Sequence, residues 1–391
     1  MQLERPISKF EAILLLLFFI PAISLPLAKQ IIMEEPDNFA VEAHAPHPFP
    51  EFSLRRKNLN GFAEDFENYY GDHFGFRSLL LNGGNILRVR YLGMSPTPDV
   101  VVGKDGWFFY AGGGSLDRAS EESSFTLAQL QHWQSFLEER QRWLNRRGIR
   151  YLFVIPRDKQ TIYPEFLPSR FSHSTPGKMT DQLVRYLSAH SSVPVLDLRD
   201  SLLAAKARDQ IYYSLDTHWN SVGAFAGYTR IMERLAEWFP ELKPVDRSQF
   251  NLVTYITSDG DLARMAGIPS LTSRQFQLVP AQKLAGPKKM RAVLPGIAQS
   301  RTHAFATEIT PPSSFPRAVM IGDSFSRGLQ PYLSRNFSRI SYFYHPPSYD
   351  AAFEKALGDY LITEHPDVFI DEMLERNIDG NVPEKRHVFD E

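Results

Sequence analysis

Two short segments of the chain contain the side chains that a serine nucleophile needs. Asp216 and His218 lie two residues apart, so a single turn can hold the carboxylate against the imidazole. Ser324 follows Gly322 and an apolar run at 318–321, the layout of a strand that ends in a tight turn and presents a hydroxyl at the sheet edge. A serine hydroxyl needs a base to become a good nucleophile, and the base needs an acid to fix its tautomer. The sequence therefore predicts acyl transfer with Ser324 as nucleophile, His218 as base and Asp216 as orienting acid.

These residues also have structural interpretations. Ser324 could cap the helix that begins near Phe325, a role compatible with catalysis because a helix N-terminus offers N–H donors to an oxyanion. An Asp-x-His pair could bind a metal, but no second histidine cluster at ligand spacing lies nearby in sequence, and we expect neither metal nor cofactor. We expect Trp219 to pack beneath the loop. Asp323 is expected to brace the nucleophile turn through backbone amides.

The chain resembles the AlgJ/AlgX family of polysaccharide O-acetyltransferases, which carry an SGNH-hydrolase-like domain. The likeness rests on Asp-x-His-Trp at 216–219 and Gly-Asp-Ser-Phe-Ser at 322–326, with further matching segments at 66–77, 103–110 and 162–168. The resemblance implies an acetyl-serine intermediate on Ser324 and an exported polysaccharide as acceptor. It also implies that a separate multi-pass membrane acyltransferase supplies the acetyl group.

Two other functions fit the same residues. The same triad with water as acceptor would be a periplasmic carbohydrate acetylesterase, and the sequence does not separate hydrolysis from transfer. A non-catalytic SGNH-like scaffold of a polysaccharide-export complex would keep the fold without turnover. Such a scaffold has no reason to keep Asp216, His218 and Ser324 together.

The groups that stabilise the oxyanion or hold the substrate are less clearly marked. SGNH enzymes generally use the serine amide, a glycine and an asparagine side chain from separate loops, and this chain has Asp158 where relatives often place the asparagine. Lys159 or Arg157 could supply positive charge instead. Asn220 is an alternative donor, with capping of the following helix as its competing role. Arg376 follows the last predicted strand, at the sheet edge where open α/β folds bind ligands, and could contact the substrate.

Composition limits which classes of protein and of chemistry are possible. The 391 residues are 43% hydrophobic and 23% charged, which is typical of a folded protein with a sizeable core. The net charge of −2 argues against a general nucleic-acid binder. The absence of cysteine excludes disulfides, thiol catalysis and cysteine-ligated zinc.

The N-terminal segment predicts export. Residues 12–28 are apolar and uncharged, with Arg5 and Lys9 before them and several carboxylates between 34 and 42. This asymmetry predicts a periplasmic remainder, anchored to the inner membrane by 12–28. The alternative is a signal peptide cleaved after a small-x-small pattern at 22–24, which would release the protein.

We predict that the whole chain has three parts: a signal anchor or signal peptide at 1–30, a proline-rich linker at 31–60 and an SGNH-like domain at 61–391. Strands alternate with helices in that domain, so we predict an α/β three-layer sandwich with a mostly parallel sheet. An inserted segment at 245–315 is expected to carry a few strands. The predicted helices lie at 65–90, 126–147, 179–187, 221–239, 326–337 and 350–363, the strands at 151–155, 193–198, 318–321, 340–344 and 368–370, and a hairpin at 100–110.

Overall fold

The computed structural model describes residues 8–32, 46–50, 59–119, 123–171, 173–258, 260–282, 286–298, 303–310, 314–345, 351–380 and 389. Most of the predicted linker at 31–60 lies outside these ranges. The chain divides into two compact units. One comprises residues 1–96 with 264–269, and the other comprises 97–263 with 270–391.

The smaller unit is helical: α1 (Lys9–Ile32), α2 (Leu59–His73) and α3 (Arg77–Leu92). The single helical stretch predicted at 65–90 is divided because Phe76 adopts a left-handed conformation with φ of 66°, which interrupts the helix. Asp72 accepts hydrogen bonds from the backbone N–H and the ring of His47, at 2.9 and 2.6 Å, so its role in this unit is structural.

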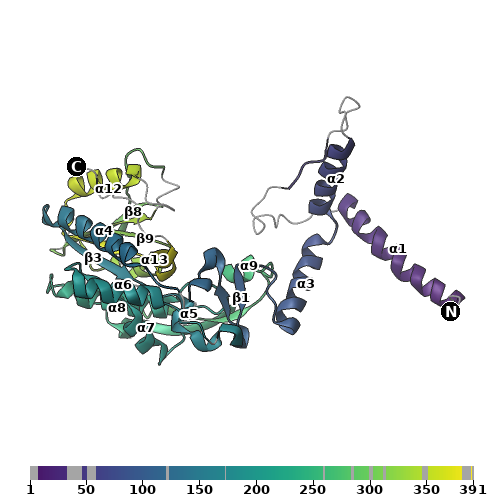
Figure 1. Cartoon of the computed structure of the whole chain (residues 1–391), viewed down its shortest axis with the longest axis horizontal. Helices are drawn as coiled ribbons and strands as arrows, with labels where there is room; N and C mark the ends of the chain where they lie inside the picture. Colours follow the sequence, from purple (N-terminus) through teal and green to yellow (C-terminus); the bar gives the residue numbers. More distant parts are fainter. Residues whose placement is uncertain are drawn as a thin grey trace. The chain divides into compact units, whose positions relative to one another are not determined.

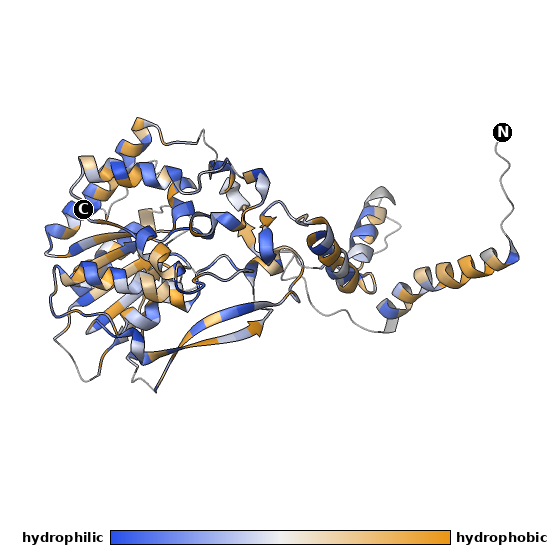
Figure 2. Ribbon diagram, turned by 90° about the horizontal axis from the view of Figure 1, so that it is seen from below, coloured by the Kyte–Doolittle hydropathy of each residue, from blue (hydrophilic) through white to orange (hydrophobic). Residues whose placement is uncertain are grey.

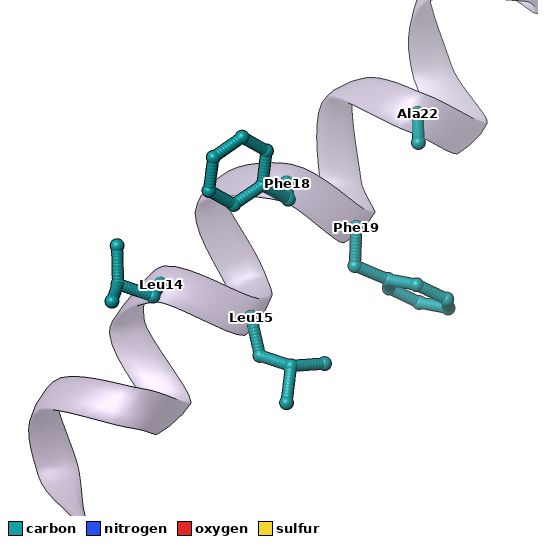
Figure 3. Close-up of a pocket in the computed structure, with 5 residues that line it drawn as sticks. All are labelled: Leu14, Leu15, Phe18, Phe19 and Ala22. Carbon is teal, nitrogen blue, oxygen red and sulfur yellow. The ribbon is translucent and has the colours of Figure 1, made fainter.

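Helix α1 is drawn as hydrophobic along most of its length in Figure 2. A shallow pocket on it is lined by Leu14, Leu15, Phe18, Phe19 and Ala22, whose side chains project away from the ribbon in Figure 3. All five are apolar, so this pocket offers no group for acyl transfer. In the part of the chain that the structure describes, no helix is long and apolar enough to cross a membrane. The predicted anchor therefore stays a prediction.

The larger unit is built on a seven-stranded sheet with the order β4-β3-β11-β9-β10-β8-β7. The first five of these strands run parallel, and β8 and β7 continue the sheet antiparallel. The sheet is therefore mixed, because the predicted insertion adds two strands to its edge. The bounds are β3 (Arg150–Ile155), β4 (Val195–Asp197), β7 (Lys288–Arg291), β8 (Phe305–Glu308), β9 (Arg317–Gly322), β10 (Arg339–Tyr344) and β11 (Val368–Glu372).

Helices cover both faces of this sheet, which makes the unit a three-layer sandwich (Figure 1). Successive strand residues point to opposite faces, so Leu152 and Val154 join one core while Tyr151 and Phe153 join the other. The first core includes α7 (Arg199–Lys206), α8 (Ser221–Ala236) and α11 (Ser326–Leu333), and the second includes α4 (Leu127–Asn145), α6 (Lys178–His190) and α12 (Ala351–Glu364).

Local signals explain several of these boundaries. Thr126 and Gln129 form a capping box at the start of α4, an arrangement that stabilises a helix by about 1 kcal/mol. The predicted hairpin is present as β1 (Val100–Val102) and β2 (Phe108–Tyr110). Its turn contains Asp105 at a φ of 53°, a conformation that aspartate tolerates better than most residues.

The remaining elements lie around the sheet's carboxyl edge and in the insertion. The insertion begins with a separate antiparallel ribbon of β5 (Phe250–Thr257) and β6 (Ser273–Pro280), and α9 (Asp261–Met265) follows β5. Two short helices lie at the carboxyl edge: α5 (Lys159–Ile162), which follows β3, and α13 (Glu375–Gly380), which follows β11.

Candidate active site

The nucleophile candidate Ser324 lies in the turn after β9. This strand pairs with β11 on one side and β10 on the other, so the turn lies in the middle of the sheet's carboxyl edge. Asp323 braces the turn as predicted: Oδ1 accepts from the N–H of Phe325 and Oδ2 from the N–H of Leu374, both at 2.9 Å. Gly322 has no room for a side chain, because a Cβ there would lie 2.3 Å from Oε2 of the buried Glu372.

The base candidate lies in the loop that leads into α8. Asn220 caps that helix: its Oδ1 accepts from the N–H groups of Val222 and Gly223, and its Nδ2 donates to the carbonyl of Gln210 at 2.7 Å. The structure thus shows the buried Asn220 in its competing role as the helix cap, with its oxygen and one of its two N–H donors already used. Trp219 is buried beneath the loop as predicted, and its Nε1 donates to the carbonyl of Phe325.

The fold brings the three predicted catalytic side chains into one hydrogen-bonded chain. Nε2 of His218 lies 2.8 Å from Oγ of Ser324, and Nδ1 lies 2.7 Å from Oδ1 of Asp216. Although burial opposes ionisation of Asp216, the hydrogen bond and charge of His218 lower its pKa to about 2. An ionised carboxylate only accepts hydrogen bonds, so we assign the imidazole proton to Nδ1. Nε2 is then free to accept the proton of Ser324.

Lys159 is buried against the loop that carries Asp216 and His218. Its Nζ donates to the carbonyl oxygens of Tyr213, Ser214 and Asp216, at 3.0, 3.0 and 2.7 Å. Burial lowers the pKa of Lys159 to about 7, although the carboxylates of Asp216 and Asp261 oppose this shift. With 2% of its surface exposed, Lys159 fixes the loop that carries Asp216. The expectation that it contacts substrate is wrong.

Arg157 is likewise structural. It is fully buried, and its guanidinium donates to Asp197 and, at 2.7 Å, to Asp181. Although burial opposes the charge, the hydrogen bond to Asp197 raises the pKa of Arg157. These contacts use the guanidinium, so Arg157 does not supply positive charge to Ser324.

Arg376 is the one of the four predicted binding residues whose side chain keeps some exposure, at 15%. Its Nη2 lies 2.8 Å from Oδ1 of Asp158, and its Cζ lies 4.8 and 6.0 Å from the ring centroids of Tyr110 and Phe325. The neighbouring carboxylate of Glu375 is engaged elsewhere, because it accepts from the hydroxyl of Thr161 and the N–H of Asp158.

Asp261 is a site residue that the sequence analysis missed. Its Oδ2 lies 3.6 Å from Nδ1 of His218. Asp216, His218 and Asp261 place ligand atoms within 4.8 Å of one another, a spacing that could hold a metal ion. In this arrangement Nδ1 donates to Asp216, so it has no lone pair for a metal. The hydrogen bonds thus favour proton transfer over metal binding at this place.

The chain matches a known protein family over most of its larger unit. The family described as "SGNH hydrolase-like domain, acetyltransferase AlgX" matches residues 100–372. The chain belongs to this family. Its matched range includes Asp216, His218, Asp261 and Ser324, and Arg376 lies just beyond it. The predicted SGNH-like fold class and the predicted family are confirmed.

Two individual relatives of the chain are also named as probable O-acetylases. "Probable alginate O-acetylase AlgJ" of Pseudomonas aeruginosa is 28% identical over 278 residues, which is 68% of this chain and 66% of the relative. The protein of the same name from Azotobacter vinelandii is 29% identical over 173 residues, 42% of this chain and 41% of the relative. The chain thus spans just under two thirds of the first relative and about two fifths of the second.

A solved structure supports the fold alone. PatB1 of Bacillus cereus superposes with a TM-score of 0.51 at 13% identity, and the match covers 72% of this chain and 98% of PatB1.

Proposed function

We propose that this AlgX-family chain is an O-acetyltransferase that moves an acetyl group through acetyl-Ser324 to hydroxyls of an exported polysaccharide. One observation carries the proposal. In a family of acetyltransferases, the hydrogen-bonded chain from Ser324 through His218 to Asp216 has contacts of 2.8 and 2.7 Å. Such a chain is the arrangement that activates a serine for acyl transfer.

The reaction would proceed in two half-reactions. Oγ of Ser324 attacks the carbonyl carbon of the acetyl donor while its proton moves to Nε2 of His218. The tetrahedral intermediate collapses, the leaving group takes that proton, and Ser324 is left as an acetyl ester. A sugar hydroxyl then gives its proton to Nε2 and attacks the ester carbonyl. When this second intermediate collapses, the imidazolium returns the proton to Ser324.

Arg376 is the cation that we place on the substrate side of the site. The ion pair with Asp158 and the two neighbouring rings hold its guanidinium beside Phe325, the residue that follows the nucleophile. The donors of Lys159 are used by loop carbonyls, and those of Arg157 by the partly buried carboxylates of Asp181 and Asp197. A fixed guanidinium at this edge can stabilise a developing oxyanion or bind a carboxylate of an acidic sugar.

The partners and location complete the proposal. The names of the two AlgJ relatives point to an alginate-like acceptor, and the family resemblance points to a multi-pass membrane acyltransferase as acetyl supplier. We place the enzyme in the periplasm and on the inner membrane through residues 12–28. The basic residues before this segment and the acidic ones after it favour that orientation.

The test is intact mass after incubation with a small activated acetyl ester. We expect wild type to gain one acetyl group on Ser324, and Ser324→Ala to remain folded but gain none and transfer none. Added glycan then distinguishes the functions, since a transferase acetylates the glycan whereas an acetylesterase releases acetate only. A Ser324→Ala variant that turns over like wild type, or a wild type that is never acetylated, would contradict the proposal.

A further inference from the structure

The ribbon of β5 and β6 reaches the catalytic loop through its tip. The N–H groups of Leu262 and Ala263 both donate to the carbonyl of Leu215, at 3.1 and 3.2 Å. Gly260 allows this approach, because a Cβ there would lie 2.4 Å from the same carbonyl oxygen. The inserted segment is thus tied to the loop that carries Asp216 and His218.

The same tip places Asp261 in contact with Thr217 and with Asp216, the residue before it. Its two carboxylate oxygens accept from the N–H and the hydroxyl of Thr217, at 2.7 and 2.6 Å. Its own N–H donates to Oδ2 of Asp216 at 2.9 Å. The Thr217 hydroxyl lies 3.2 Å from Nδ1 of His218, so it lies between that ring and the second carboxylate.

We propose that Asp261 is a positioning residue for the transfer reaction, a second carboxylate that holds His218 and stabilises it when it carries the proton of Ser324. The inference rests on the proposed function. Asp216 orients the imidazole through a direct hydrogen bond, whereas Asp261 acts through its charge and through Thr217. The imidazolium formed during each half-reaction would then face two carboxylates, one at 2.7 Å and one at 3.6 Å.

The surroundings of the ring are consistent with this role. Burial and the charge of Asp216 raise the pKa of Asp261, while hydrogen bonds from Thr217 and the charge of His218 oppose the rise. The two acids therefore lie on the same side of His218 in a partly buried space. Two carboxylates lie near the His218 ring: Asp216 on the same loop and Asp261 on the ribbon tip. Two cations lie farther away. Lys159 of α5 donates to the carbonyl of Asp216, and Arg376 of α13 lies near the Phe325 ring, which in turn contacts His218.

The test is Asp261→Asn in the full chain, because the amide keeps the size of the side chain and removes its charge. We expect kcat/KM for acetyl transfer to fall about tenfold, because the transition state loses one of the two carboxylates that stabilise the imidazolium. We also expect the acidic limb of the pH–rate profile to move to lower pH, because the imidazolium has lost one of two stabilising carboxylates. The thermal unfolding midpoint should stay close to that of wild type.

Two further variants serve as comparisons for Asp261→Asn. Asp246→Asn makes the same change on a residue at the base of the ribbon whose side chain accepts from the N–H of Ser248, and it should leave rate and profile unchanged. Thr217→Val removes the bridging hydroxyl but keeps both carboxylates, so it should lower the rate without moving the profile as far as Asp261→Asn does.

The outcomes separate this inference from the proposed function. A profile for Asp261→Asn that superimposes on wild type, or a rate loss that merely follows a fall in the unfolding midpoint, overturns the role of Asp261. If Ser324→Ala is inactive at the same time, the proposed function stands. If Ser324→Ala remains active, the proposed function fails first.

Discussion

Asp216 holds His218 at two points. Its Oδ1 accepts from both the backbone N–H and the ring Nδ1 of His218, at 2.9 and 2.7 Å, and Oδ2 accepts from the N–H of Asp261. An amide at this position would offer the imidazole a donor where it now meets an acceptor. The ring would then favour the tautomer that carries its proton on Nε2 and could not accept from Ser324.

We therefore expect Asp216→Asn to be nearly as damaging as His218→Ala, with a loss of acetyl transfer on the order of 10³ to 10⁴ in rate. Steady-state transfer to a soluble glycan measures the loss, and circular dichroism checks that both variants are folded. A drop of less than about tenfold in Asp216→Asn would mean that another group orients His218.

Some contacts of the site could be predicted from the sequence, and others depend on how distant segments fold together. The contact between Asp216 and His218 was predictable from their close spacing, and the position of Ser324 in a turn after a strand was predictable from the apolar run and the glycine before it. Asp261 was not, because 44 residues separate it from Thr217 and only the ribbon tip brings them together. Lys159 and Asn220 were expected to help hold the oxyanion or the substrate, whereas the structure pairs both with backbone groups, which leave no trace in residue type.

At the scale of elements, the nucleophile depends on the close contact between the ends of β9 and β11. Glu372 ends β11, and its Oε2 accepts from the N–H of Asp323 at 3.0 Å. Burial and the charge of Asp323 raise the pKa of Glu372 well above its usual value. A buried carboxyl side chain therefore supports the turn, with Gly322 as the point of closest approach.

Gly322→Ala should displace this turn and lower acetylation of Ser324 by at least about tenfold, with some loss of thermal stability. The added methyl would lie 2.3 Å from Oε2 of Glu372 and 2.8 Å from Cβ of Ser326, neither of which is free to move in the core. Gly83→Ala in α3 is the control, because its Cβ meets nothing within 4 Å. Equal activity of the two variants in the mass assay would show that the turn is not tightly constrained.

The elements themselves were predictable where burial controls the pattern. The strands at 151–155, 318–321 and 340–344 are apolar runs because the sheet is covered on both faces. Strand β7 was missed because its sequence, Lys-Lys-Met-Arg, contains three cations. It lies at the sheet edge, where exposed charged side chains are typical because they discourage pairing with another chain.

At the scale of the whole molecule, the proposed function requires the larger unit to lie outside the cytoplasm. A reporter that works only in the periplasm, fused after Glu391, should be active, and a strictly cytoplasmic reporter should be silent. The same fusions without residues 1–30 should show the reverse. Mapping the N-terminus in membrane fractions then separates the two forms of export: Met1 indicates a retained anchor, and a start near Leu25 indicates a cleaved signal peptide. An active cytoplasmic reporter on the full chain would contradict both location and acceptor.

The strand order has a consequence for when the protein can fold. Strand β11 pairs with β3 on one side and β9 on the other, yet it is the last strand of the described chain. Until residue 372 is available, the pair β3–β4 and the group from β9 to β7 have no common neighbour. The central contacts also join distant parts of the sequence, as between Arg140 and Asp371, 231 residues apart, and such contacts form slowly. The seven-stranded sheet of a nascent chain therefore cannot close before residue 372 has been made, because β3 and β9 meet only through β11.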